Sequence, residues 1–197
     1  MNVAKGLLRG AMAFVIAASV VAPASATTLV RESLDGLVAG NRAVVVGEVL
    51  DASSYWNEDH TFILTDVRVA VHEAVKGRVD REITVTLMGG QVGDITTLIV
   101  GGPELIPGNS YVLFLNEENL PGVERALTVR DLVQGAFDVR IGEGGLRAIS
   151  QAIKHPLLPD ARGSYEPEGG AEGFPLNSMI QSIRDIAGRD AARREVK

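Results

Sequence analysis

The sequence predicts a mainly β protein: an antiparallel β-barrel or sandwich with a short N-terminal helix and an amphipathic C-terminal helix. Two observations support this fold class. Between residues 43 and 141, short β-branched or alternating segments are separated by turns rich in glycine and proline. Apolar residues spaced by three and four, which are typical of helices, occur only near the two ends of the chain that follows residue 26.

The first 26 residues have the pattern of a signal peptide. Lys5 and Arg9 precede an apolar stretch from Ala11 to Ala22, and the small residues Ala24-Ser25-Ala26 follow it. A membrane anchor is the alternative, but the stretch is shorter than the roughly 20 residues that a spanning helix needs. We therefore expect an exported protein, periplasmic or extracellular, with no transmembrane segment after cleavage.

Charge and cysteine content argue against several classes of protein. The formal net charge is −6, and loss of Lys5 and Arg9 would make it more negative still. An acidic exported domain repels phosphate backbones, so nucleic acid is a poor candidate partner. The chain contains no cysteine. Without disulfides, thiol nucleophiles or thiolate metal ligands, the fold must depend on its apolar core.

Four segments are expected along the chain. After the signal peptide at 1–26, residues 27–153 form the β-barrel domain, 154–174 a linker rich in glycine and proline, and 175–197 a C-terminal helix with a charged tail. Apolar spacing predicts a short helix near residues 29–38 that ends at Gly40 or Asn41. The C-terminal helix carries an apolar stripe, made of Leu176, Met179, Ile180, Ile183 and Ile186.

The first two strands show different patterns. Residues 43–50 are continuous and β-branched, as in a strand that is buried on both sides or closes a barrel. Residues 61–73 alternate, which places Val67, Val69 and Val71 on a core face and Arg68 and His72 on the opposite face. The polar residues 51–59 are expected to form the turn between them.

Further strands follow at shorter intervals. They are predicted at residues 81–88, 95–100, 110–115, 125–131 and 135–141. Residues 143–150 (EGGLRAIS) fit either the return arm of a hairpin or a short helix, and periodicity does not distinguish the two.

The glycine-rich loop Gly89-Gly90-Gln91-Val92-Gly93-Asp94 invites comparison with a phosphate-binding loop. A P-loop needs Gly-Lys-Ser/Thr and a helix after its glycines, but here Asp94 stands where a cation is wanted and a β-rich run follows. A dinucleotide-binding loop is disfavoured for the same reason. We therefore expect the glycines to shape a bend between strands.

No stretch supplies a complete catalytic set. Ser110 has only the first half of a nucleophile elbow, so it is expected to be a turn residue. The three histidines, His60, His72 and His155, stand in three different segments. We predict no catalytic, cofactor-binding or metal-ligating residues and no cofactor. The alternative is a hydrolase or metal-dependent enzyme with a site near the 48–60 turn, whose best candidates are Glu48, Asp51, Glu58, Asp59 and His60.

The same turn is the candidate binding surface, made of Tyr55, Trp56, Glu58, Asp59 and His60. Trp56, the single tryptophan, has two interpretations. It is either a binding anchor, because aromatic residues offer large contact area with few torsions, or a cap on one end of the barrel. The cap is favoured because tryptophans bury most of their surface.

Motifs in residues 43–141 resemble a group of uncharacterised secreted bacterial proteins. The matching features are the strand VVVGEV, the Val75-Lys76-Gly77 turn, the Gly89-Gly90-x-x-Gly93 loop, the strand SYVLFL and the hairpin residues QGAF. Asn109 departs from the group, which more often has Glu there. The resemblance implies a five-stranded OB-type barrel, the architecture of netrin modules and tissue inhibitors of metalloproteinases.

The likeness to those inhibitors is one of architecture and does not carry function with it. The inhibitors chelate zinc through an N-terminal cysteine held by a disulfide, whereas the mature chain here is expected to begin at Thr27. The group itself implies no activity. Sequence alone therefore favours an exported, non-enzymatic binding module for an envelope or extracellular protein or a glycan. A third hypothesis is an envelope component whose C-terminal helix docks on a partner.

We predict cleavage between Ala26 and Thr27, because the small-residue triplet ends there. N-terminal sequencing of the exported protein is expected to begin within about two residues of Thr27. A full-length form retained in the membrane would contradict the prediction.

Overall fold

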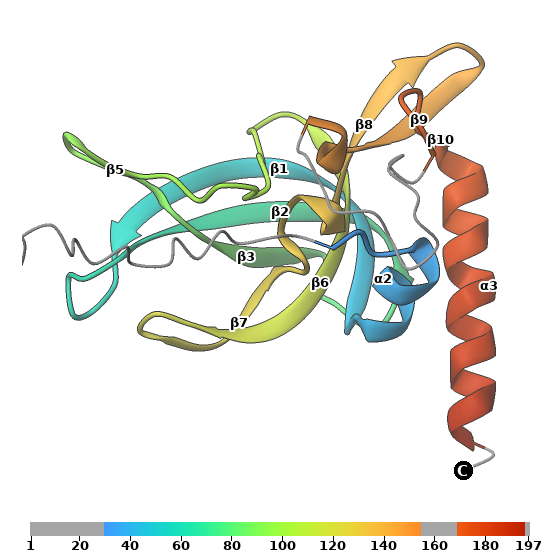
Figure 1. The fold of residues 1–197 in the computed structure, drawn as a ribbon, viewed down its shortest axis with the longest axis horizontal. Coiled ribbons are helices and arrows are strands. Elements are labelled where there is room, and N and C mark those ends of the chain that lie inside the picture. The colour runs from blue at the N-terminus through green and yellow to red at the C-terminus, as the bar shows by residue number, and fades with distance from the viewer. Residues whose placement is uncertain (1–29, 155–168, 196–197) are drawn as a thin grey trace, which may run out of the picture.

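The computed structural model describes residues 30–154 and 169–195 (Figure 1). The predicted signal peptide and residues 155–168 of the predicted linker lie outside the described residues. The described elements, in chain order, are α2 (Leu34–Gly40), β1 (Ala43–Trp56), β2 (Ile63–Lys76), β3 (Glu82–Met88), β4 (Gly90–Val92), β5 (Ile95–Thr97), β6 (Ser110–Leu120), β7 (Val123–Val129), η1 (Leu132–Gly135), β8 (Ala136–Gly142), β9 (Gly145–Ser150), η2 (Gln151–Lys154), β10 (Phe174–Pro175) and α3 (Leu176–Glu195).

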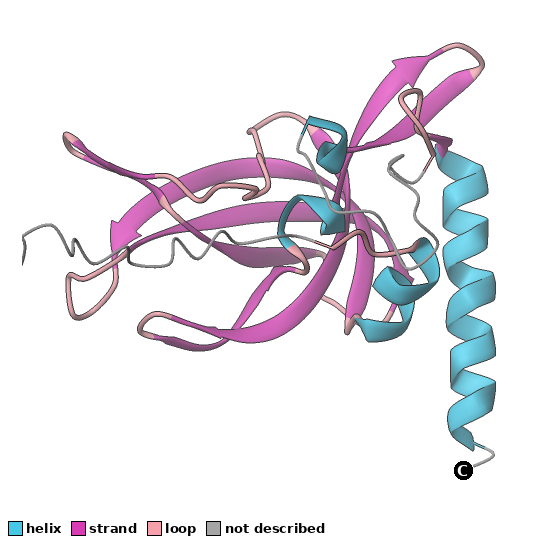
Figure 2. Cartoon of the chain, viewed as in Figure 1, coloured by secondary structure: helices cyan, strands magenta, loops and turns pink. Residues whose placement is uncertain are grey.

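The protein is mainly β, with antiparallel pairing throughout the described sheets, as the sequence predicts (Figure 2). The main sheet has the order β10-β9-β8-β6-β1-β2-β3, and β7 pairs with β6 beside this path. The sheet curls until β3 and β7 face each other, but the described strands form no ladder between them. The sheet is therefore open along a seam between β3 and β7.

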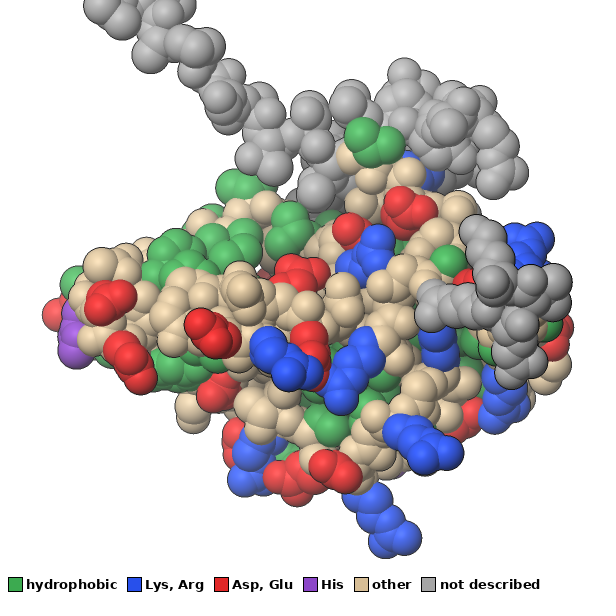
Figure 3. All heavy atoms as spheres, turned by 90° about the horizontal axis from the view of Figure 1, so that it is seen from below, with side chains coloured by type: hydrophobic (Ala, Val, Ile, Leu, Met, Phe, Trp, Pro, Cys, Tyr) green, Lys and Arg blue, Asp and Glu red, His purple; other side chains and the backbone are tan. Residues whose placement is uncertain are grey.

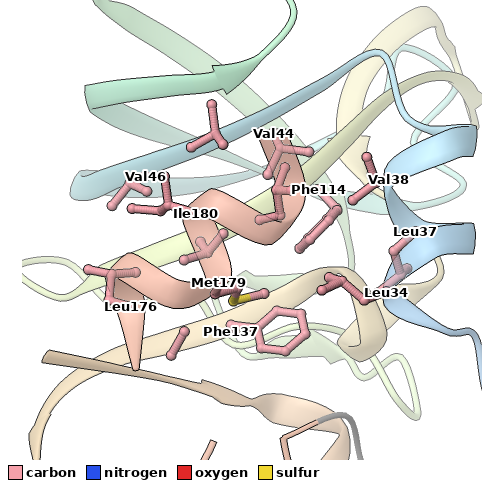
Figure 4. Packing of buried hydrophobic residues seen from close by; sticks show 14 of the residues in the cluster. Leu34, Leu37, Val38, Val44, Val46, Phe114, Phe137, Leu176, Met179 and Ile180 are labelled. Atoms are coloured by element: carbon pink, nitrogen blue, oxygen red, sulfur yellow. The ribbon is translucent and has the colours of Figure 1, made fainter. Parts of the chain in front are cut away.

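Strands β1 and β6 are buried on both faces, which explains the continuous valine run. Val45 lies opposite Leu113 and faces the inside of the curled sheet. Val44 lies opposite Phe114, and both pack toward the helices on the other face (Figure 4). The domain therefore has two apolar clusters, one on each side of the β1–β6 pair.

The two helices cover the outer cluster. In α2 the side chain of Ser33 caps the first turn by accepting a hydrogen bond from the Gly36 N–H at 3.2 Å, and Asn41 follows as the C-cap. α3 lies across one end of the sheet (Figure 1). It buries its expected apolar stripe against the sheet and α2, namely Leu176, Met179, Ile180, Ile183 and Ile186.

The structure corrects two predicted boundaries. Residues 51–56, expected in a turn, belong to β1, since they continue the ladder with β2 although Asp51, Ala52 and Ser53 are exposed. Polar composition was misleading there because this part of the hairpin extends past the core. Residues 98–100, expected in a strand, lie outside β5 and enter a turn closed by the Gly102 N–H and the Ile99 carbonyl at 3.0 Å.

The structure also tests two further predictions from the sequence. Residues 145–150 form the return arm of the β8–β9 hairpin, so the helical alternative for this segment is wrong. Val67 and Val69 are fully buried and Val71 is half-buried, while Arg68 and His72 are exposed, as the alternation predicts.

We predict that Val69→Ala lowers the free energy of unfolding by about 1–3 kcal/mol, because it removes buried methyl groups and leaves a cavity. Arg68→Ala should lower it by about 0.5 kcal/mol or less, since the Arg68 ion pairs with Asp51 and Glu82 are solvent-exposed. Chemical denaturation measures both. Equal losses at the two positions would mean that the strand is shifted by one residue.

Candidate functional site

A cleft of about 550 Å³ lies between the ends of β2 and β3 and the loop at residues 98–105. It continues the inside of the curled sheet, because Val67 and Leu105 belong to both the cleft wall and the inner cluster. Its residues are Thr65, Val67, Leu87, Met88, Gly89, Gly90, Thr97, Leu98, Ile99, Val100, Gly101, Gly102, Pro103, Glu104, Leu105, Val133, Gln151 and Lys154.

One wall of the cleft is the loop at 98–105, which hydrogen bonds hold in place. Gly101 has a φ of 76°, which suits glycine in the turn, and its carbonyl accepts a hydrogen bond from the Val133 N–H at 3.0 Å. The Gln151 amide donates to the Glu104 carbonyl at 2.7 Å and accepts from the Glu104 N–H at 2.9 Å. The loop is thus fastened to η1 and η2.

The loop at residues 98–105 exposes two aliphatic side chains to solvent. Leu98 is 83% exposed and Val100 is 84% exposed. Met88, at the end of β3, is also exposed. Figure 3 shows hydrophobic side chains that gather in a patch on the surface, at the end of the molecule where the strands extend away from α3. The cleft therefore has an apolar rim that no described residue covers.

The opposite wall contains the glycine loop. The Gly89 N–H donates to the Ile63 carbonyl at 2.8 Å, and the Thr65 hydroxyl donates to the Gly89 carbonyl at 2.7 Å. Gly90 has a φ of 131°, and a Cβ there would overlap the hydroxyls of Thr65 and Ser54. These glycines let the chain pass from β3 to β4 close to β1 and β2, which is the bend between strands that the sequence predicts.

Polar chemistry in the cleft is sparse. Among the described residues that line it, Glu104 and Lys154 carry charge and none is aromatic. Thr65 and Gln151 already bond to other groups of the protein. The lining can therefore bind aliphatic groups by burial.

The five residues of the candidate binding surface lie away from this cleft, on and beyond the end of β1. The Tyr55 phenol donates to Asp66 Oδ1 at 3.2 Å, and Thr86 donates to the same oxygen at 2.7 Å. Burial, followed by the neighbouring Asp66 carboxylate, raises the pKa of Tyr55, so the phenol remains a hydrogen-bond donor at neutral pH.

Trp56 and His60 form a stacked pair, with ring centroids 6.5 Å apart and planes inclined by 20°. Trp56 is half-buried at the last position of β1, while Glu58 and Asp59 are exposed. The turn is built around Asn57, whose Oδ1 accepts from the Thr61 N–H at 2.8 Å and the Phe62 N–H at 3.0 Å. Sequence reasoning missed Asn57, although asparagine bonding to nearby backbone is a common turn signal.

The carboxylates proposed for an enzymatic site do not meet in one place. Glu48 lies 3.8 Å from His72, and Asp51 lies 3.4 Å from Arg68, both on the exposed face of the sheet. Glu58, Asp59 and His60 are in the turn, and none of the five residues lines the cleft. Among the described residues, no group of three or more His, Asp or Glu side chains is arranged to hold a metal ion.

Sequence reasoning also missed the cleft itself. Its residues come from five separate stretches of chain, and the apolar run Leu98-Ile99-Val100 has the pattern of a strand. Comparisons with protein-family models and with curated proteins found no match. Among the helices in the described ranges, none has the length and hydropathy required to span a bilayer.

We predict that Gly90→Ala lowers the free energy of unfolding by about 2–4 kcal/mol, through strain at positive φ and overlap with Thr65 and Ser54. Gly93→Ala is the matched control. Gly93 also has positive φ, but its Cβ would meet nothing within 4 Å, so the loss should be about 1 kcal/mol. Thermal and chemical denaturation measure both variants.

The same loop should bind no nucleotide, since it offers neither the lysine nor the helix N-terminus that phosphate recognition uses. Calorimetry with ATP, GTP or NAD at millimolar concentration should show no saturable heat. Micromolar affinity that Gly90→Ala abolishes in a folded protein would restore the loop as a binding site.

Proposed function

We propose that the protein is an exported, non-enzymatic binding module that holds an apolar segment of an envelope or extracellular protein in the cleft beside residues 98–105. We further propose that its sheet is an OB-type barrel left open at the seam between β3 and β7. The predicted signal peptide supports export. The facing positions of β3 and β7 support the barrel architecture.

One observation carries the binding proposal. Leu98 and Val100 project almost fully into water at the mouth of a cleft that continues the apolar core. Burial of each side chain contributes about 1.5–3 kcal/mol, and an exposed apolar patch beside a concave surface is typical of an interaction site. Because the loop is fastened by Gln151 and Val133, this surface is formed before a partner arrives.

A protein partner fits the cleft better than a glycan. Sugar rings are commonly held by aromatic faces and by polar groups, whereas this lining is aliphatic and its described polar side chains are largely engaged within the protein. The aromatic pair Trp56 and His60 lies outside the cleft. If the ligand were a glycan, this aromatic pair would be its binding site.

The alternative of a hydrolase or metal-dependent enzyme has less support. Its candidate residues form separate ion pairs or stand in the exposed turn, and the concave surface belongs to other residues. Docking through the C-terminal helix is also disfavoured, because the apolar stripe of α3 is already packed against the protein's own sheet.

The test is an affinity capture from the native envelope fraction with the full chain and two variants. Leu98→Asp combined with Val100→Asp should abolish recovery of a specific protein. Both positions are exposed, so folding should change by no more than about 0.5 kcal/mol per substitution. Ile141→Asp is the matched control, since Ile141 is 89% exposed on the β8–β9 hairpin, away from the cleft.

A protein recovered by the wild type and by Ile141→Asp, but not by the double variant, would support the proposal. Recovery of the same protein by all three would place its binding site elsewhere. Recovery of a glycan, lost in Trp56→Ala and kept in the double variant, would move the function to the aromatic pair.

A further inference from the structure

We propose that the partner segment binds as an added β-strand. It would run antiparallel to β3 along the open seam and place an aliphatic side chain in the cleft. This inference rests on the proposed function, because it specifies how the apolar segment is held.

The hydrogen-bond register identifies which backbone groups of β3 are free. At one end of the β2–β3 ladder the Gly89 N–H donates to the Ile63 carbonyl, and at the other the Val71 N–H donates to the Arg81 carbonyl. The same register pairs Thr65 with Leu87 and Val67 with Val85 between these ends. In an antiparallel ladder, alternate residues direct their N–H and C=O groups to the opposite side.

The outward residues of β3 are therefore Glu82, Thr84, Thr86 and Met88. In the described residues β3 pairs with β2 alone, so these N–H and C=O groups have no partner strand. A peptide strand satisfies such groups directly, which an acyl chain or another purely apolar ligand does not.

Apart from the charged Glu82 at its first position, the edge of β3 lacks the features that usually prevent strand addition. Residues 82–88 (EITVTLM) contain no proline, glycine or lysine and form no bulge with β2. The strand at the other end of the sheet, β10, is only two residues long and contains Pro175, a residue that cannot donate to a ladder. The two ends of the sheet thus differ in their capacity to accept a strand.

The seam supplies an apolar floor for the added strand. Ile83 and Leu87 on β3 and Leu127 on β7 are only partly buried, although they pack against the inner cluster. Ile83 and Leu127 line the same small pocket, which lies at the narrow end of the seam between β3 and β7. Toward Met88 the seam meets the cleft, and in Figure 1 β3 and β7 diverge in this direction. The added strand therefore pairs with the Thr84 to Met88 part of β3.

Charge at the narrow end favours an acidic residue near the C-terminal end of the added strand. An antiparallel strand runs from Met88 toward Arg81, and both Arg78 and Arg81 are exposed there. Within the described chain neither guanidinium has an ion-pair partner. Of the two neighbouring acids, Glu82 is paired with Arg68, which leaves Asp80 beside the two arginines. The partner's chemistry is thus an extended segment with alternating aliphatic residues and a carboxylate at its end.

The probe is a fluorescent synthetic peptide of about eight residues, the length of an ordinary strand. It has Leu or Val at alternate positions, Thr between them and Asp at its C-terminal end. Two further peptides carry backbone N-methyl groups on one or the other alternate set, so that each lacks the N–H groups along one edge. Fluorescence anisotropy with the full chain should show saturable binding of the unmodified peptide.

On the protein side, Thr84→Pro removes an outward N–H that the β2 ladder does not use. Thr84→Val keeps that N–H and serves as the matched control. We expect Thr84→Pro to weaken peptide binding by about tenfold or more and Thr84→Val to leave it within about twofold. Circular dichroism checks that both variants fold. If Thr84→Pro does not fold, the N-methylated peptides test the same bonds, and only one of them should lose affinity.

The outcomes separate this inference from the proposed function. Absence of peptide binding to the wild type, or equal binding to Thr84→Pro, would overturn strand addition, whereas the capture experiment with Leu98→Asp and Val100→Asp would still test the cleft. Equal affinity of both N-methylated peptides would also overturn it. A wild-type chain that forms dimers which Thr84→Pro abolishes would identify a second copy as the occupant instead of a partner segment.

Discussion

Burial of β1 and β6 on both faces is the constraint on which the rest of the structure depends. Val45 and Leu113 face the inside of the curled sheet, while Val44 and Phe114 face the helices. A strand pair with two apolar faces needs two covers, because either face left in water would expose several large side chains. The curl of β2, β3 and β7 provides one cover, and α2 with α3 provides the other. The C-terminal helix is therefore part of the core.

The two covers leave the inner cluster enclosed unevenly. Toward the β1–β2 turn, the long hairpin extends past the core, which is why residues 51–53 are exposed although they remain in the ladder. Beside this end of the hairpin, the wall of the curled sheet is the loop at residues 98–105, which is anchored through Leu105, and not a strand. A loop of glycine and proline cannot close the wall as a paired strand does, so the cleft remains beside it.

Local patterns were enough to predict the elements whose burial is regular. The alternation in 61–73 and the spacing of Leu176, Met179, Ile180, Ile183 and Ile186 depend on one face being apolar, and periodicity records that directly. The predictions for residues 51–56 and 98–100 were wrong because local composition contradicts the tertiary setting there. The first is a polar stretch in a ladder, and the second is an apolar stretch that enters a turn. The cleft was beyond prediction, since its walls meet only after the sheet curls.

The mainly aliphatic lining of the cleft is the strongest support for the proposed binding function. Catalysis requires acids, bases or metal ligands to converge on one reacting group, usually in a recess that excludes water. Here the charged pairs Asp51–Arg68 and Glu48–His72 lie on the exposed face of the sheet, whereas the recess is lined mainly by aliphatic side chains and glycines, with Glu104 and Lys154 as its described charged residues. The recess also adjoins the edge of β3, which lacks proline, glycine and lysine. Apolar burial and free backbone hydrogen-bonding groups side by side are what an extended polypeptide uses for binding, which is the function that we propose.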